Sequence, residues 1–186
     1  MTDIEAQGLD VMYGSPKNPA KIYDWEKSKR PKSADLLEDK TAASLNVHAS
    51  NSDCVLLKHC SRTVTFIWAM DLQGAVHLAI EELAELPGGM ESRGHPRRRD
   101  YPVHPATDKK LGHPTVLPLE DKRARIAGEL FLDFDDTNKL IWFVNDNSGR
   151  YCKNDVPTAM QKQNVLELFK TFLGEQIRFD ELGAVA

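Results

Sequence analysis

The sequence predicts an α+β fold, a single domain with a mixed or mainly antiparallel sheet and a C-terminal helix packed on one face. Two apolar runs, 126–134 and 139–146, flank a polar connection, which is the pattern of a β-hairpin. Residues 62–70 are rich in β-branched and aromatic side chains, which favour strands. Over 158–173 apolar residues recur at helical spacing, and Gly174 follows where a helix commonly ends.

The other segments carry weaker patterns. Residues 1–35 are rich in Pro, Lys, Asp and Gly around isolated large side chains, which predicts an irregular N-terminal arm. The apolar segments 54–60 and 176–181 are interpreted as strands. Residues 76–80 alternate as in a strand, whereas the residues up to 86 fit a helical stripe, so we expect a strand that runs into a short helix.

One hydrophobic core is expected for the chain. Its 186 residues are 41% hydrophobic and 28% charged, which is typical of one folded domain spanning residues 1–186. Trp68 and Trp142 lie on predicted strands and are expected in or beside that core. The other expected core residues are Phe66, Ile67, Phe131, Ile141, Phe143, Leu168 and Phe172.

Residues 87–125 are predicted to form a long loop rich in His, Pro and Arg. Pro87-Gly88-Gly89 ends any regular element, and five more prolines follow: Pro96, Pro102, Pro105, Pro114 and Pro118. This loop holds nine Lys/Arg against five Asp/Glu, so the remainder of the chain has fifteen against twenty-three, a balance of −8. Loops of this length are usually functional or disordered, and this one places basic charge on an acidic protein.

Composition and motifs exclude several classes of protein. No stretch approaches the roughly 18 apolar residues of a membrane helix, and the N-terminus lacks a signal-peptide core. We therefore expect a cytoplasmic, soluble protein without a Sec signal, which leaves export by a dedicated secretion system open. Three cysteines suggest reduced thiols. The net charge of −4 disfavours nucleic-acid binding, and no GxGxxG or Walker motif occurs.

Three histidines of the loop stand nine residues apart, and each precedes a proline: His95, His104 and His113. No HxH, HExxH or paired-cysteine motif accompanies them, so no metal site is expected. A neutral imidazole on a proline-rich loop could serve as a general base or orient a substrate. The alternative is that these histidines are simply hydrogen-bonded on a solvated loop.

The arginines in and near the loop allow two interpretations. They could form an anion-binding rim, because guanidinium groups match phosphate and carboxylate oxygens, or they could balance the acidic remainder of the chain. These arginines are Arg93, Arg97, Arg98, Arg99, Arg123 and Arg125.

No GxSxG motif marks a nucleophile. Ser148 lies on a predicted turn and Cys152 follows closely. Either could act as a nucleophile, but a plain turn residue and a buried thiol are the preferred interpretation. Strand alternation places Glu129 on the face opposite Leu130, where a single acid usually faces solvent.

A set of short motifs within 113–151 carries a family resemblance: His113-Pro-Thr-Val-Leu, Ala127-Gly128-Glu129, the strand pair, and Asn147-Ser148-Gly149-Arg150-Tyr151. This pattern resembles C-terminal domains of bacterial polymorphic toxins and effectors. A similar run is found in plant IQ-motif calmodulin-binding proteins, but the IQ motif is absent here, so calmodulin binding is not implied. Arg150 stands where the pattern often has histidine.

The resemblance implies an enzyme that acts on a cellular target, by ADP-ribosyl transfer or by cleavage of NAD as substrate. It implies His113, Ser148 and Tyr151 as catalytic residues brought toward one cleft. The candidate substrate-binding residues are Arg97, Arg99, Arg123, Arg150 and Glu129.

A second hypothesis is a binding module without enzymatic activity, such as an immunity protein that neutralises a basic partner. The balance of −8 outside the loop favours it. Both hypotheses expect a protein partner, as target or as cognate toxin or immunity protein, and neither expects a membrane. The sequence leaves open whether the protein is an enzyme.

Overall fold

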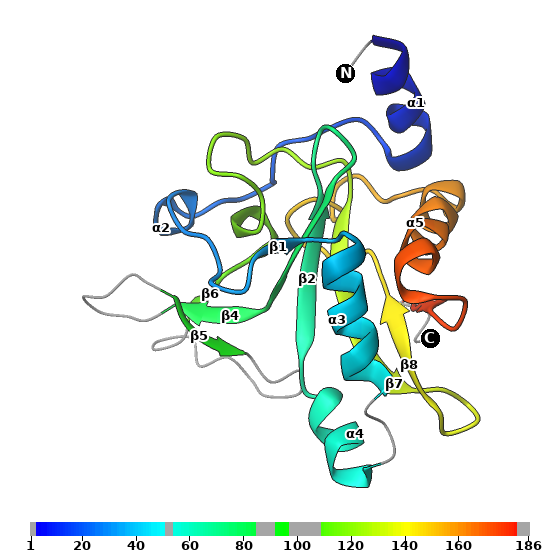
Figure 1. The fold of residues 1–186 in the computed structure, drawn as a ribbon. Helices are drawn as coiled ribbons and strands as arrows, with labels where there is room; N and C mark the ends of the chain where they lie inside the picture. Colours follow the sequence, from blue (N-terminus) through cyan, green and yellow to red (C-terminus); the bar gives the residue numbers. More distant parts are fainter. Residues whose placement is uncertain (1–2, 51–53, 85–91, 97–108, 182–186) are drawn as a thin grey trace.

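A mixed sheet forms the centre of the computed structural model, which describes residues 3–50, 54–84, 92–96 and 109–181. Its strands follow the order β1-β3-β2-β7-β8-β9, and only β8 and β9 run parallel (Figure 1). They are β1 (Asp35–Leu36), β2 (Thr65–Met70), β3 (Val76–Ile80), β7 (Ala127–Phe134), β8 (Leu140–Val144) and β9 (Arg178–Phe179). The predicted α+β class with a mixed sheet is confirmed.

Two helices cover one face of this sheet. They are α3 (Asp39–Ser50) and α5 (Ala159–Leu173), which pack on each other and on β8 (Figure 1). The core lies between helices and sheet, where Trp68 meets Phe169 edge to face at 5.3 Å and Phe66 meets Trp142 at 6.0 Å between ring centroids. The expected burial of both tryptophans and the C-terminal helix is therefore confirmed.

A capping residue at the start and a glycine at the end set the limits of helix α5. The Thr158 hydroxyl accepts the Gln161 backbone N–H, while the Gln161 side chain accepts the Thr158 N–H, so two otherwise unpaired donors are satisfied. Gly174 ends the helix with φ of 89°, a conformation that glycine adopts without strain.

The predicted hairpin is formed by β7 and β8, which pair from Leu130 opposite Val144 to Phe134 opposite Leu140. The Asp135 carboxylate accepts the backbone N–H groups of Thr137 and Lys139, which closes the turn. Asn138 adopts φ of 60° there, as asparagine often does.

The prediction of an irregular N-terminal arm is corrected over residues 3–13 and 24–27. Residues 1–35 contain helix α1 (Asp3–Tyr13) and the short helix α2 (Asp24–Lys27). Helix α1 turns Ala6, Leu9 and Tyr13 toward the protein on one face. In addition, Arg125 binds Asp10 and the Asn164 amide donates to the Met12 carbonyl. Contacts with distant residues therefore hold this helix against α5.

Two further expectations are corrected. The apolar run predicted as a strand over 54–60 forms helix α4 (Val55–Ser61), and its Val55, Leu56 and Leu57 are exposed. A run this short fits either element by periodicity, so the apolar pattern alone does not distinguish helix from strand. The short helix expected after residue 80 is instead β4 (Glu82–Ala84).

Strand β4 belongs to a second sheet in the order β5-β4-β6, with β5 (Ser92–Pro96) and β6 (Lys109–Lys110). Strands β5 and β6 and the 3-10 helix η1 (His113–Thr115) come from the segment predicted as a loop over 87–125. That segment is therefore not a loop throughout. Its residues 87–91 and 97–108 lie outside the described residues.

The segment from Leu111 to Leu117, which includes η1, lies on the face of the main sheet opposite α3 and α5. Leu111, Val116 and Leu117 are fully buried there, and η1 contacts β2. Glu129 pairs with Ile67 and so faces this side. In the part of the chain that the structure describes, no helix is long and apolar enough to cross a membrane.

Candidate functional site

A cleft of about 290 Å³ opens on the side of the sheet covered by η1. Its walls come from the N-terminal segment, the end of β3, β6, η1, β7 and the turn after β8. The residues that line it are Lys21, Tyr23, Glu81, Lys110, Gly112, His113, Glu129, Asn147, Gly149 and Arg150. Charged groups of both signs, from segments far apart in the sequence, therefore meet in one place.

Glu129 is the central acid of this cleft. Its Oε2 accepts hydrogen bonds from the amides of Asn147 at 3.2 Å and Asn145 at a longer 3.5 Å. Burial raises the pKa of the Glu129 carboxyl, the nearby Glu81 raises it further, and the amide donors only partly offset these effects. Such a carboxyl exchanges protons closer to neutral pH than an ordinary glutamate does.

The backbone on both sides of Glu129 is fixed by Asn145, which is fully buried. The Asn145 side-chain oxygen accepts the Glu129 N–H at 2.9 Å, and the Asn145 N–H donates to the Glu129 carbonyl at 3.0 Å. Gly128 permits this approach, because a Cβ there would lie 1.8 Å from the Asn145 carbonyl oxygen. Glycine at 128 is thus required for the geometry of the acid.

His113 enters the cleft from η1. Its Nε2 lies 2.9 Å from the Gly128 carbonyl oxygen, which can only accept, so Nε2 carries the proton and Nδ1 is the basic nitrogen. Burial lowers the pKa of His113 to about 4. At neutral pH the ring is therefore uncharged and suited to accept a hydrogen bond or to position another group.

This pKa predicts a loss of stability in acid. Unfolded histidine titrates near about 6.5, so the unfolded state binds the proton first as pH falls from about 6.5 toward 4. The contribution of His113 is complete above that window, and about 2 kcal/mol of it is lost by about pH 4.5. Urea unfolding measured above about pH 6.5 and again at about pH 4.5 should reveal this difference in the free energy of unfolding. His113→Asn should have a smaller pH dependence, and an unchanged one would contradict the assignment.

The cationic side of the cleft is held by specific partners. Lys110 Nζ lies 2.8 Å from Oε1 of the buried Glu81. Lys21 Nζ sits 4.3 Å from the centre of the Tyr23 ring, and Arg150 lies 4.9 Å from it. The hydrogen bond from Lys21 and the positive charge of Lys21 lower the pKa of the Tyr23 hydroxyl. These groups give the mouth of the cleft a positive rim around an acidic interior.

Glu26 is a buried residue that connects the segments forming the walls of the cleft. This side chain is 0% exposed, and its Oε1 accepts from Arg150 Nη2 at 3.2 Å and from the Gly112 N–H at 3.3 Å. Its Oε2 accepts the Tyr23 N–H at 2.9 Å. Arg150 also donates to the Lys21 carbonyl. One buried carboxylate thus connects the N-terminal segment, η1 and the turn after β8.

The candidate residues fall into separate groups. His113, Glu129 and Arg150 meet in the cleft. Ser148 is buried in the neighbouring turn. The Tyr151 hydroxyl donates to the Lys122 carbonyl at 2.5 Å, so Tyr151 does not lie in the cleft. Cys152, the other thiol considered, bonds the Ala127 carbonyl at 3.2 Å.

The arginines are likewise divided. Arg123 pairs with Asp121 on the surface, and Arg125 is buried against Asp10 and the Leu72 and Gly14 carbonyls. Arg125 therefore serves the fold and not an anion-binding rim. Arg97 and Arg99 lie outside the described residues.

The position of Tyr151 predicts a structural effect. Tyr151→Phe should lower the free energy of unfolding by about 1 kcal/mol, because the half-buried Lys122 carbonyl loses the hydroxyl that donates to it. Chemical denaturation measures this change. A loss of function at unchanged stability would instead assign the hydroxyl to catalysis.

Sequence reasoning missed Lys21, Tyr23, Glu81 and Lys110 as cleft residues and Glu26 as their support. Glu81 did carry a signal. It directly follows a predicted strand and two apolar residues, and a carboxylate in such a buried position needs a charged or hydrogen-bonding partner. The lysines carried none, since only the folded chain brings β6 and the N-terminal segment to this place.

The chain was compared with protein-family models, with curated proteins and with solved structures. None of the three comparisons gives a match. The resemblance to toxin and effector domains therefore stays a prediction, and the geometry of the cleft is the basis on which function is argued.

Proposed function

We propose that this protein is a toxin- or effector-type enzyme that breaks the bond between nicotinamide and ribose in NAD, with water or a group on a cellular target as acceptor. The observation that carries the proposal is Glu129, a largely buried carboxyl of raised pKa placed beside Glu81 in a cleft with a cationic mouth. Acids of this kind are common at catalytic sites.

The chemistry suits the residues of the cleft. As the bond from ribose C1′ to the nicotinamide nitrogen breaks, positive charge develops on the ribose ring, and nearby carboxylates stabilise it. Nicotinamide leaves as a neutral molecule and needs no acid. Glu129 accepts the proton of the water that attacks C1′, so the products are nicotinamide, ADP-ribose and a proton. In ADP-ribosyl transfer, a nucleophile of the target takes the place of water.

The remaining groups position the substrate in this proposal. Lys21, Lys110 and Arg150 attract the negatively charged diphosphate. The neutral His113 accepts a hydrogen bond from a ribose hydroxyl through Nδ1, because Nε2 is engaged by Gly128. Tyr23 offers an aromatic surface at the mouth.

The alternative is an immunity-type binding module that recognises a basic protein partner. Two observations favour it: the balance of −8 outside residues 87–125, and the exposed Val55, Leu56 and Leu57 on α4. It leaves the buried charges of the cleft without a role, so we place it second.

Expression in bacteria from a tightly controlled promoter tests the choice. The wild type should arrest growth and deplete cellular NAD, whereas Glu129→Gln should do neither. Glu38→Gln, which changes an exposed glutamate, is the control and should behave as the wild type. Equal growth and equal NAD in all three strains would overturn the enzyme proposal and favour the binding module.

A further inference from the structure

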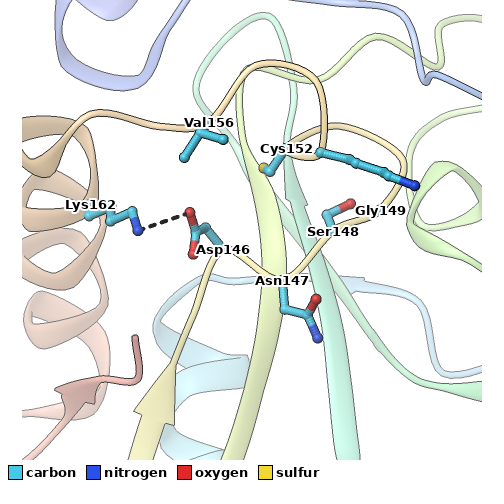
Figure 2. A pocket seen from close by; sticks show the side chains of 8 residues that line it. Asp146, Asn147, Ser148, Gly149, Cys152, Val156 and Lys162 are labelled. Carbon is cyan, nitrogen blue, oxygen red and sulfur yellow. Dashed lines mark ion pairs between the residues drawn. The ribbon is translucent and has the colours of Figure 1, made fainter. Parts of the chain in front are cut away.

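A second hollow lies beside the cleft, along the turn that follows β8. Its volume is about 360 Å³, and its walls come from this turn and from the start of α5. Figure 2 shows Lys162 reaching Asp146 across it, while Asn147 points away from that pair. Asn147 and Gly149 line both this hollow and the cleft.

Ser148 gives this hollow an unused polar group. The residue is 3% exposed, lines the hollow, and its hydroxyl has no hydrogen-bond partner among the described residues. Buried hydroxyl groups are normally paired, because an unpaired one loses the hydrogen bonds it makes with water. A ligand oxygen in the hollow would satisfy it.

The hollow also carries positive charge. Lys162 Nζ lies 3.4 Å from Asp146, at the long end of an ion pair. Lys153 lines the hollow too and has no acidic partner in the part of the chain that is described. Two lysines against one aspartate, together with a free hydroxyl donor, favour an anion with oxygen acceptors.

Gly149 lines both hollows and brings no side chain between them. A Cβ added to Gly149 would have no atom within 4 Å, so the backbone there borders open space. A molecule in the cleft can therefore continue over Gly149 into the second hollow without meeting a side chain at that residue.

We propose that the second hollow binds the other half of the same substrate, so that the enzyme acts on a dinucleotide and not on a mononucleotide. This inference rests on the proposed function. The nicotinamide ribose lies at Glu129, and the substrate passes over Gly149, so that the AMP half occupies the second hollow with its phosphate against Ser148, Lys153 and Lys162. Each hollow is of the size of a small-ligand site, about 300 Å³.

Kinetics with two substrates test the proposal on the purified full chain. Lys153→Gln and Ser148→Ala should each raise KM for NAD about tenfold, as expected for the loss of one hydrogen bond to an anion. Neither should change kcat, and neither should change KM for nicotinamide mononucleotide, which lacks the adenosine half. Lys40→Gln, an exposed lysine of α3, is the control. Equal effects on both substrates, or none on NAD, would overturn the proposal.

Binding of AMP by calorimetry separates this inference from the proposed function. If NAD is not cleaved but AMP binding weakens about tenfold in Lys153→Gln, the nucleotide site stands and the enzyme proposal fails. If NAD is cleaved and AMP binding is the same in wild type and variant, the enzyme proposal stands and the second site fails.

Discussion

Glu129→Gln is expected to lower kcat/KM for NAD cleavage by at least about 100-fold while the fold stays intact. Glutamine keeps an oxygen that can accept from Asn147 and Asn145, so the shape of the site is preserved. It cannot take a proton from water and cannot carry the charge that stabilises the ribose cation. Nicotinamide release, followed by chromatography, measures the effect.

The matched control for this variant is Glu38→Gln, which removes the same charge from an exposed position. It should retain the wild-type rate. Circular dichroism should give the same spectrum and the same melting temperature for all three proteins within a few degrees. A rate in Glu129→Gln within a factor of three of the wild type would mean that another group acts as the base.

Gly128→Ala should be the most destabilising single change in the site, with a loss of about 3 kcal/mol or complete failure to fold. The added Cβ would stand 1.8 Å from the Asn145 carbonyl oxygen and 2.9 Å from Asp146 Cα, and both atoms belong to backbone that cannot rotate away. Moving them would also break the hydrogen bonds between Asn145 and the Glu129 backbone. Urea denaturation gives the free energy of unfolding.

Gly149→Ala provides the comparison, because nothing lies within 4 Å of its added Cβ. Its free energy of unfolding should stay within about 0.5 kcal/mol of the wild type. Equal stability of both alanine variants would show that the β7 backbone has room at Gly128, which the structure excludes.

Local patterns were sufficient where an element is stabilised by its own residues. The hairpin follows from two apolar runs around a turn that Asp135 closes, and α5 follows from its apolar spacing and the Thr158 cap. Patterns failed where distant contacts decide. Helix α1 is held by Arg125 through Asp10, and β4 forms because β5 and β6 lie on either side of it.

The candidate site divides in the same way. His113, Glu129 and Arg150 were named from short motifs, and they lie together because η1, β7 and the following turn are neighbours in the fold. Tyr151 belongs to the same motif and directly follows Arg150, but its side chain packs in the core and bonds the Lys122 carbonyl. Lys110 comes close to Glu81 only because β6 pairs with β4, so no spacing in the sequence links the two residues.

The pH dependence of NAD cleavage by the wild-type protein tests the central claim most directly, which is that the ionised Glu129 drives the reaction in the cleft. Because burial raises the pKa of this carboxyl, kcat/KM should rise with pH as one group ionises, with a midpoint above that of an ordinary glutamate near about 4.3. A midpoint at or below the ordinary value, or the absence of nicotinamide release at any pH, would contradict the account.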